Sequence, residues 1–174
     1  DTIAKITQAT GLDKVADIAE NFYDILSNLN EGPILEYNLK RIIGHKSLNH
    51  QISIVPDFEY ENLIVDTKAT QQFPSDPFKT KQNHIRQAAL YGILLNKPTA
   101  LLYATDKKCA IFQLPPNVVK NEGEYMLDVF RKIEKTNKLF KNAKEFMEYT
   151  VLNTDGYKWD ENTKTRANRY WSKT

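Results

Sequence analysis

Two carboxylates and one ammonium group lie close together in the stretch Ile52–Thr70, as Asp57, Asp66 and Lys68. Side chains alternate between the two faces of a β-strand, so Asp66 and Lys68 project from one face if this stretch is a strand. Two carboxylates at short range raise each other's pKa, and a hard divalent cation such as Mg²⁺ relieves the repulsion while also binding water and substrate phosphates. A lysine there could orient or deprotonate a water molecule, or stabilise negative charge on a phosphate. These residue types together indicate hydrolysis of phosphodiester bonds.

Two short apolar runs must position these groups. The first, Ile52–Val55, ends at Pro56–Asp57, and the second, Asn62–Val65, continues into Asp66. We expect the two runs to pair as a hairpin that brings both carboxylates and the lysine together. An acid, any residue and a lysine at a strand end often occur with no catalytic role. The Pro56–Asp57 pair at the start of the same predicted hairpin favours the catalytic interpretation.

Two helices are expected before the hairpin. Apolar residues at helical spacing predict the first from Lys14 to about Leu29, capped by Asp13, and the second from Ile34 to about Ile43. Glu36 lies at the edge of the apolar face of the second helix. It is either a solvated surface residue or, if this helix packs over the hairpin, an additional metal ligand.

A long polar loop and a further helix are expected after Lys68. The loop, Ala69–Lys81, is long for a connection, and long loops beside a site are often functional. The helix is predicted from about Gln82 to Leu95. Gln87 and Tyr91 are four positions apart and therefore share one face of it, where they could hydrogen-bond a phosphate or the lysine amine. The alternative is an amphipathic helix with a half-buried tyrosine.

The second half of the chain predicts a strand pair, a long helix and an arm. The strands are Ala100–Ala104 and Cys109–Leu114, the helix runs from about Glu122 to Phe140, and residues 143–150 are expected to add a short helix. From Asn153 onward the chain is rich in aromatic and basic residues, which are interleaved. That pattern suits single-stranded nucleic acid, whose bases stack and whose phosphates pair, and it equally suits an arm that docks its two tryptophans on the core.

Composition limits the class of protein. The chain has 174 residues, 41% of them hydrophobic, and a formal net charge of +2, which by itself gives no argument for nucleic acid. The single Cys109, expected in the core, excludes an intramolecular disulfide and a cysteine-ligated iron–sulfur cluster within this chain. Without a long apolar run or a signal peptide, we expect a cytoplasmic protein with no membrane partner. We expect one domain over residues 1–152, with N-terminal helices at 13–43 and a catalytic core at 51–140, followed by the arm at 153–174.

The motifs taken in order resemble the PD-(D/E)xK nuclease superfamily. They are Glu36, Pro56–Asp57, Asp66–Thr67–Lys68 and Gln87–Tyr91. The glutamine–tyrosine element is similar to that of the branch containing the RecB nuclease domain, the CRISPR-associated adaptation nucleases and the mitochondrial genome maintenance exonucleases. The resemblance covers roughly Pro33 to Phe140. It implies an α/β (α+β) restriction-endonuclease-like core, a central mixed sheet flanked by helices, and metal-dependent cleavage of DNA.

The resemblance also implies roles for single residues. Asp57 and Asp66 correspond to metal ligands, the carbonyl of Thr67 to a further ligand, and Lys68 to the catalytic lysine. Gln87 and Tyr91 correspond to the motif that helps position the site and the DNA. Many relatives have histidine where this sequence has Glu36, and other members of the superfamily use glutamate. Basic and aromatic residues expected to contact DNA are Lys79, Lys81, Arg86, Arg166, Arg169 and Trp171.

The sequence therefore leads to a specific hypothesis. We expect a Mg²⁺- or Mn²⁺-dependent DNA exonuclease, acting on single-stranded DNA or duplex ends in replication, recombination or repair. The alternatives are a structure- or sequence-specific endonuclease of the same fold, or a DNA-binding module without activity. An oligomer, or a partner protein from replication or recombination, is compatible with this hypothesis. Many Asn, Lys and Ile with few Gly suggest an AT-rich source such as a phage.

Overall fold

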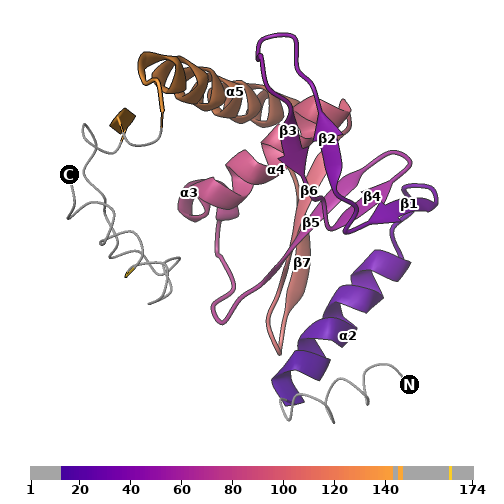
Figure 1. Cartoon of the computed structure of the whole chain (residues 1–174). Coiled ribbons are helices and arrows are strands. Elements are labelled where there is room, and N and C mark those ends of the chain that lie inside the picture. The colour runs from indigo at the N-terminus through magenta and orange to yellow at the C-terminus, as the bar shows by residue number, and fades with distance from the viewer. Residues whose placement is uncertain (1–12, 143–144, 147–164, 166–174) are drawn as a thin grey trace. The chain divides into compact units, whose positions relative to one another are not determined.

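The computed structural model describes residues 13–142, 145–146 and 165, and its chain forms two compact units (Figure 1). Residues 1–130 form the first unit, which carries the sheet, and residues 131–174 form the second. In the second unit the rings of Phe140 and Phe146 make an edge-to-face contact. The domain boundary predicted between residues 152 and 153 lies outside the described residues, as does most of the short helix predicted over 143–150.

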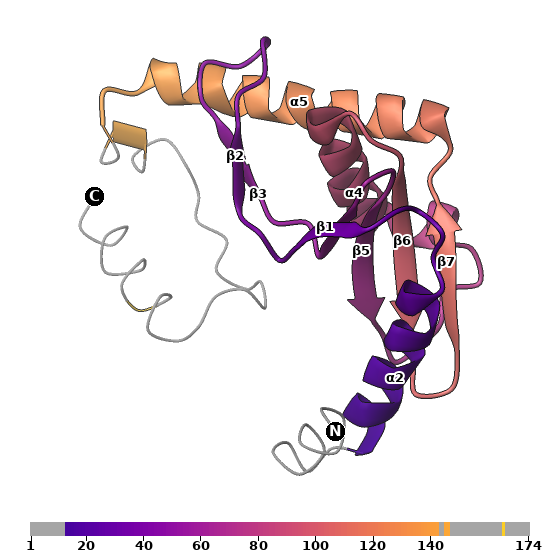
Figure 2. The same cartoon turned by 90° about the vertical axis from the view of Figure 1, so that its right-hand side faces the viewer.

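A five-stranded mixed sheet is the centre of the first unit. Its strand order is β1-β4-β5-β6-β7. β5 and β6 are parallel, and every other neighbouring pair is antiparallel, as the arrows of β5, β6 and β7 show (Figure 2). The strands are β1 (Ile34–Tyr37), β4 (Phe58–Tyr60), β5 (Ile64–Ala69), β6 (Thr99–Ala104) and β7 (Cys109–Gln113). A separate antiparallel pair joins β2 (Arg41–Ile43) to β3 (Ile52–Ile54).

Helices cover both faces of this sheet (Figure 1). On β5, Ile64 packs with Leu90 and Tyr91 of α4 (Gln82–Leu95), whereas the next residue, Val65, packs in the cluster that receives α2 (Asp13–Ser27). Adjacent strand residues point to opposite faces, so α4 and α2 lie on opposite sides. α5 (Pro116–Leu139) adds Leu127 to the α4 side. The predicted central mixed sheet flanked by helices is confirmed.

The segment from Ile34 to Ile43 differs from its prediction. The helix expected there is wrong, because the segment forms β1 and β2, separated by Asn38 in a left-handed backbone conformation (φ 47°). Ile34 lies opposite Tyr60 of β4, and Arg41 lies opposite Ile54 of β3. Ten residues are too few for helical spacing to be distinguished from two short strands, and pairing with β4 and β3 decides the outcome.

The predicted hairpin is also assembled differently. β3 pairs with β2, and the hairpin partner of β5 is the intervening β4. The backbone N–H of Tyr60 donates to the carbonyl of Leu63 (2.8 Å), which closes the turn. Pro56 has no N–H to give to a ladder, so the chain divides into two strands at this point. Asp57, immediately before β4, is still brought to the end of β5.

Other elements lie close to their predicted ranges. α4 has the predicted bounds, and β6 and β7 differ by a residue. The loop after β5 contains a single helical turn, α3 (Pro77–Thr80). The N-cap residue, Asp76, accepts a hydrogen bond from the N–H of Phe78 (3.0 Å). α5 starts at Pro116 and not near Glu122, because proline suits the first position of a helix, where no N–H partner is needed.

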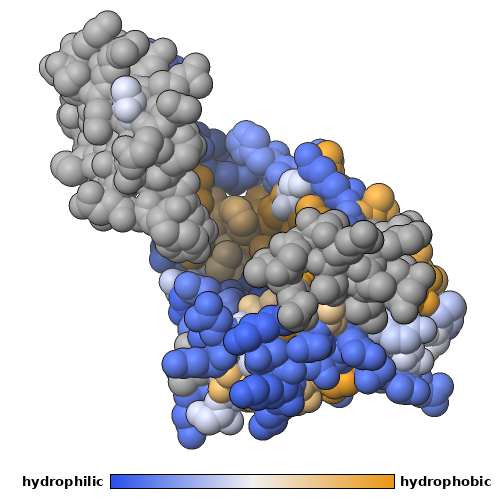
Figure 3. Space-filling model, turned by 90° about the horizontal axis from the view of Figure 1, so that it is seen from below, coloured by the Kyte–Doolittle hydropathy of each residue, from blue (hydrophilic) through white to orange (hydrophobic). Residues whose placement is uncertain are grey.

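One face of the described surface carries both hydrophilic and apolar side chains (Figure 3). Seen from below, hydrophilic side chains cover much of the described surface, and apolar side chains show between them (Figure 3). Within the described residues no helix combines the length and apolar character needed to cross a bilayer.

Candidate metal and catalytic site

Asp66 and Lys68 form a buried ion pair on β5. They share the face of the strand that α4 covers, and Lys68 Nζ lies 2.5 Å from Asp66 Oδ2. The Asp66 side chain is 1% exposed and that of Lys68 is 18% exposed. The expectation that these two residues project from one face is therefore met by the geometry. β5 therefore places a carboxylate and an ammonium group in contact at a position largely shielded from solvent.

Asp57 is held at the point where β4 and β5 diverge. Its Oδ2 accepts two hydrogen bonds from Thr67, one from the backbone N–H and one from Oγ1, each 2.7 Å long. Its own carbonyl accepts the N–H of Asn38 (3.0 Å). The N–H and C=O of one strand residue face the same neighbouring strand, so the Thr67 carbonyl is directed to the Asp57 side. Asp57 is thus bonded to Thr67, and its charge acts on the neighbouring Asp66.

Burial dominates the electrostatics of Asp66. Desolvation raises the pKa of Asp66 from 3.8 to about 6, the nearby Lys68 ammonium opposes this shift, and the charge of Asp57 adds to it. The close partner of Asp66 Oδ2 is the Lys68 ammonium, with which it forms an ion pair. A further cation near this carboxylate would favour its charged form.

Lys68 is linked to α4 by a chain of hydrogen bonds. Lys68 Nζ donates to Gln87 Oε1 (3.2 Å), Gln87 Nε2 donates to the Tyr91 hydroxyl (2.8 Å), and that hydroxyl donates to the carbonyl of Val55 (3.4 Å). Burial raises the pKa of the Tyr91 hydroxyl, so it keeps its proton for the last bond. Gln87 thus contacts the lysine amine, whereas Tyr91 contacts Gln87 and packs in the core. Contact of either residue with a phosphate stays a prediction.

His84 belongs to the same helix face and was missed from the sequence. Its Nδ1 lies 2.8 Å from the Tyr103 hydroxyl, and Tyr103 lies beside Lys68 in the strand register. Burial, together with the charges of Lys68 and Lys81, lowers the pKa of His84. The spacing of positions 84, 87 and 91 on one helix stripe is the signal that could have identified it.

Several predicted site residues lie elsewhere or have other partners. Glu36 is on strand β1, opposite Glu59 in the register, so its predicted helical position is wrong, and its role as a ligand stays a prediction. Arg86 forms an ion pair with Glu122 (3.1 Å) and its guanidinium stacks on the Tyr125 ring (4.1 Å to the centroid), which joins α4 to α5.

Of the other residues predicted to contact DNA, the structure describes two. Lys79 is 83% exposed and lies 3.3 Å from Asp76, while Lys81 immediately precedes α4. Arg166, Arg169 and Trp171 lie outside the described residues.

The donor set fits one kind of metal. In the described ranges no group of three or more His, Cys, Asp or Glu side chains gathers around a common point. This differs from a zinc site, which takes three or four such ligands. Mg²⁺ needs only one or two carboxylates, completed by water and phosphate oxygens. Asp57, Asp66 and the Thr67 carbonyl are oxygen donors of the kind and number that this requirement calls for.

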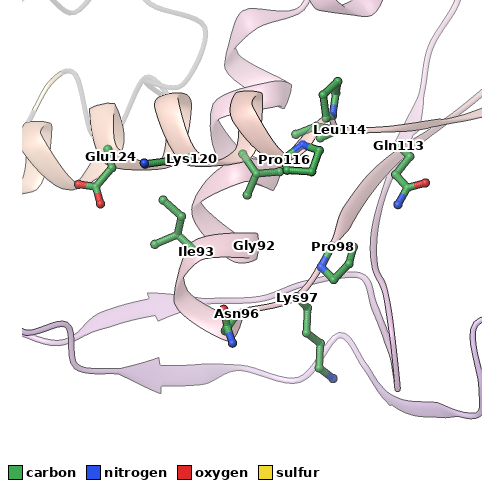
Figure 4. Close-up of a pocket in the computed structure, with 12 residues that line it drawn as sticks. Gly92, Ile93, Asn96, Lys97, Pro98, Gln113, Leu114, Pro116, Lys120 and Glu124 are labelled. Atoms are coloured by element: carbon green, nitrogen blue, oxygen red, sulfur yellow. The ribbon is translucent and has the colours of Figure 1, made fainter.

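One pocket of the first unit lies away from these residues. It has a volume of about 730 Å³ and lies among the end of α4, the start of α5 and the end of β7, where Figure 4 shows Lys97, Gln113 and Lys120 among its lining residues. None of the predicted site residues lines it. A smaller pocket of about 510 Å³ includes Asp57 and Thr67. The candidate site is therefore identified by its two acidic residues and its lysine, and not by the volume of a pocket.

Comparisons with known proteins find a similarity of fold and no similarity to a known family. No family model and no curated protein matches the chain. A solved structure from Eubacterium rectale, named "Putative exonuclease", is 16% identical with a TM-score of 0.52, and the match covers 81% of this chain and 60% of that one. The structure of SSO0001 is 16% identical with a TM-score of 0.42, covering 78% of this chain and 64% of that one. The chain thus spans less than two thirds of either protein, and it shares the fold of the first.

Proposed function

We propose that this protein is a metal-dependent deoxyribonuclease that hydrolyses phosphodiester bonds, acting as an exonuclease. The observation that carries the proposal is the buried Asp66–Lys68 pair, held by Gln87 and adjoining Asp57 at one sheet edge. The fold shared with a protein named as an exonuclease supports it. A buried ion pair is weak support for a purely structural role, because a hydrophobic pair of similar size is commonly as stable or more so.

Each residue of the site has its own role in hydrolysis. Asp57, Asp66 and the Thr67 carbonyl would hold Mg²⁺ or Mn²⁺, with Glu36 as a further candidate. The ion, when bound, supplies positive charge that lowers the pKa of water and neutralises charge on the phosphate. Lys68 is held by Asp66 and Gln87 with its amine at the same edge, where it can orient the attacking water or stabilise the pentacovalent phosphate. Tyr91 and Val55 fix Gln87 and so fix the lysine.

A cleavage assay tests the proposal. Linear single-stranded, linear duplex and circular DNA are incubated with the protein in Mg²⁺, in Mn²⁺ and in EDTA. We expect metal-dependent loss of linear DNA with circles spared. Lys68→Ala should lower kcat by roughly 10²–10⁴-fold, as removal of an acid–base group typically does. Lys120→Ala, which removes an exposed lysine at the other pocket, is the matched control and should retain activity.

Each other outcome has a definite meaning. Cleavage of circles would identify an endonuclease. Binding with steep salt dependence but no turnover would identify a DNA-binding module. Full activity of Lys68→Ala, or activity that survives EDTA, would contradict the site assignment.

A further inference from the structure

Two matching links join the sheet to α4 at the candidate site. Lys68 of β5 and Tyr103 of β6 are partners in the parallel register, so their side chains project from the same face. Lys68 Nζ donates to Gln87 Oε1 (3.2 Å), and the Tyr103 hydroxyl lies 2.8 Å from His84 Nδ1. Gln87 and His84 are one turn apart on α4. The His84 ring is therefore a neighbour of the Lys68 amine, on the face of the sheet that carries Asp66.

The buried hydroxyl of Tyr103 determines which nitrogen of His84 carries the proton. Tyr103 is fully buried, and its hydroxyl keeps its proton because burial raises the pKa of Tyr103 to about 12. Among the described residues, His84 Nδ1 is the hydrogen-bond partner that the structure gives this hydroxyl. A proton on Nδ1 would leave the buried hydroxyl proton without that acceptor, which is unfavourable. The hydroxyl therefore donates to Nδ1, and a neutral ring then carries its proton on Nε2.

This form of His84 suits an anion and not a proton transfer. Burial, and then the charges of Lys68 and Lys81, lower the pKa of His84 below its ordinary value of 6.5, so the ring is neutral at pH 7.5. A neutral ring protonated on Nε2 has no free lone pair there, so it cannot act as a base for the attacking water. It can donate a hydrogen bond to an anion. The first turn of α4, where His84 lies, contains no acidic residue, and the N-terminus of a helix favours negative charge.

We propose that His84 belongs to the active site, where its Nε2–H donates a hydrogen bond to a non-bridging oxygen of the phosphate that is cleaved. The proposal rests on the proposed nuclease function and adds a residue to the same site. No proton is transferred in this contact, which strengthens as negative charge grows on the phosphate oxygens in the transition state. Tyr103 is then a positioning residue, because its hydroxyl holds the ring and selects the tautomer.

Two substitutions separate the roles of the two ring nitrogens. The side-chain amide of asparagine reaches about as far as Nδ1, and that of glutamine about as far as Nε2. His84→Asn therefore keeps the contact with Tyr103 and loses the contact with the phosphate, whereas His84→Gln can keep the latter. On linear DNA in Mg²⁺ we expect His84→Asn to lower kcat roughly 10–100-fold, as for one lost hydrogen bond to a charged group, and His84→Gln to lose severalfold less. A purely structural role predicts the reverse order in kcat and in Tm.

His45→Ala is the matched control for these variants. His45 Nδ1 also lies 2.8 Å from a hydroxyl, that of Ser47, but both residues belong to the loop between β2 and β3. Leu48 of the same loop packs in the cluster that contains Leu127 of α5. The control should keep the native kcat.

NMR of the imidazole nitrogens tests the proposal without cleavage. In the native protein at pH 7.5, the ¹⁵N shifts of His84 should show a proton on Nε2 and none on Nδ1. In the Lys68→Ala protein, which should bind DNA in Mg²⁺ without cutting it, an added single-stranded oligonucleotide should shift the Nε2 signal. A proton on Nδ1, a doubly protonated ring, or an Nε2 signal that bound DNA leaves unchanged overturns the proposal, even if both variants fail to fold.

The cleavage assay separates this proposal from the proposed function. If the native protein cleaves DNA and His84→Asn cleaves it equally well, or better than His84→Gln, the role of His84 is overturned and the nuclease remains. If the native protein does not cleave DNA in Mg²⁺ or in Mn²⁺, both are overturned.

Discussion

Asp66 combines two properties that oppose each other in a protein without metal. Its side chain is almost fully buried, which disfavours the charged form, while its contact with Lys68 favours it. Burial prevails, so the pKa lies near 6, well above the ordinary value of 3.8. A carboxyl of this kind exchanges a proton for a cation near neutral pH. That property suits a site that must bind Mg²⁺ in competition with protons.

The raised pKa of Asp66 gives a stability prediction with a definite sign. Between pH 3.8 and about 6 the folded protein holds a proton that the unfolded chain releases, so this stabilisation is present below pH 3.8 and is lost as pH rises through about 6. The loss is on the order of 3 kcal/mol. We expect Asp66→Asn to remove this pH dependence. The stability of the variant compared with the native protein should therefore be higher at pH 7.5 than at pH 4.

The measurement is Tm in EDTA at several pH values for both proteins. Other groups titrate in both, and among them Glu59 has the opposite sign. Burial raises its pKa, but Lys97 and Arg41 outweigh burial and lower it. The difference between native protein and variant therefore isolates Asp66. Parallel curves from pH 4 to 8 would contradict the shift.

The positions of the site side chains could be predicted in part from the sequence. Period-two alternation placed Asp66 and Lys68 on one face, and the four-residue spacing placed Gln87 with Tyr91, because both rules depend only on local backbone geometry. The ion pair of Arg86 with Glu122 could not be predicted, because it joins residues 36 positions apart on two helices. His84 was overlooked although its spacing was visible.

Among the elements, α4 matters most for the site, since it carries Gln87, Tyr91 and His84. Its periodicity was long enough to define it, and the structure gives the predicted range. The neighbouring short strands were harder. β1, β2 and β4 have four, three and three residues, and their pairing is set by partners distant in sequence. This explains why the helix predicted over Ile34–Ile43 and the partner predicted for β5 were both wrong.

Close packing of α5 on α4 gives a prediction at this scale. Gly123 is buried, and a Cβ there would meet the Ile93 side chain and lie 3.0 Å from the Ala89 carbonyl oxygen. Overpacking of this kind typically destabilises by about 1–3 kcal/mol, and the better helix propensity of alanine offsets about 1 kcal/mol. We expect Gly123→Ala to lower the free energy of unfolding by up to about 2 kcal/mol.

Urea denaturation measures this change. Gly44→Ala is the matched control, because a Cβ at Gly44 meets no atom within 4 Å and its backbone is not left-handed. The control should stay within about 1 kcal/mol of the native protein. Equal effects at the two glycines would show that α4 and α5 are not packed this closely.

For the whole molecule, the topology explains why residues far apart in sequence share one site. β5, α4 and β6 form a crossover between parallel strands, which places α4 over the face that carries Asp66 and Lys68. The order of β5 and β6 cannot be read from short apolar runs, so the mixed sheet was predicted from the family resemblance and not from periodicity. The same fold occurs in the longer Eubacterium rectale protein.

Metal binding should be visible as stability of the whole chain. An ion that binds only the folded protein stabilises it by RT ln(1 + [L]/Kd), about 2.7 kcal/mol at one hundred times Kd. For a chain of this size 1 kcal/mol corresponds to roughly 2–4 °C, so saturating Mg²⁺ should raise Tm by about 5–10 °C relative to EDTA. Asp57→Asn and Asp66→Asn should each abolish the increase, because each removes half of the described carboxylate charge at the edge.

Two further variants make this experiment specific. Glu124→Gln, at the other pocket, removes an exposed carboxylate without touching the site and should keep the full increase. Glu36→Gln tests the third acid: a reduced increase would identify it as a ligand, and an unchanged one would leave Asp57, Asp66 and the Thr67 carbonyl as the protein's ligand set. If Mg²⁺ raised the Tm of Asp57→Asn and of Asp66→Asn as much as that of the native protein, the ion would bind elsewhere, and the buried Asp66 and half-buried Asp57 would need another explanation.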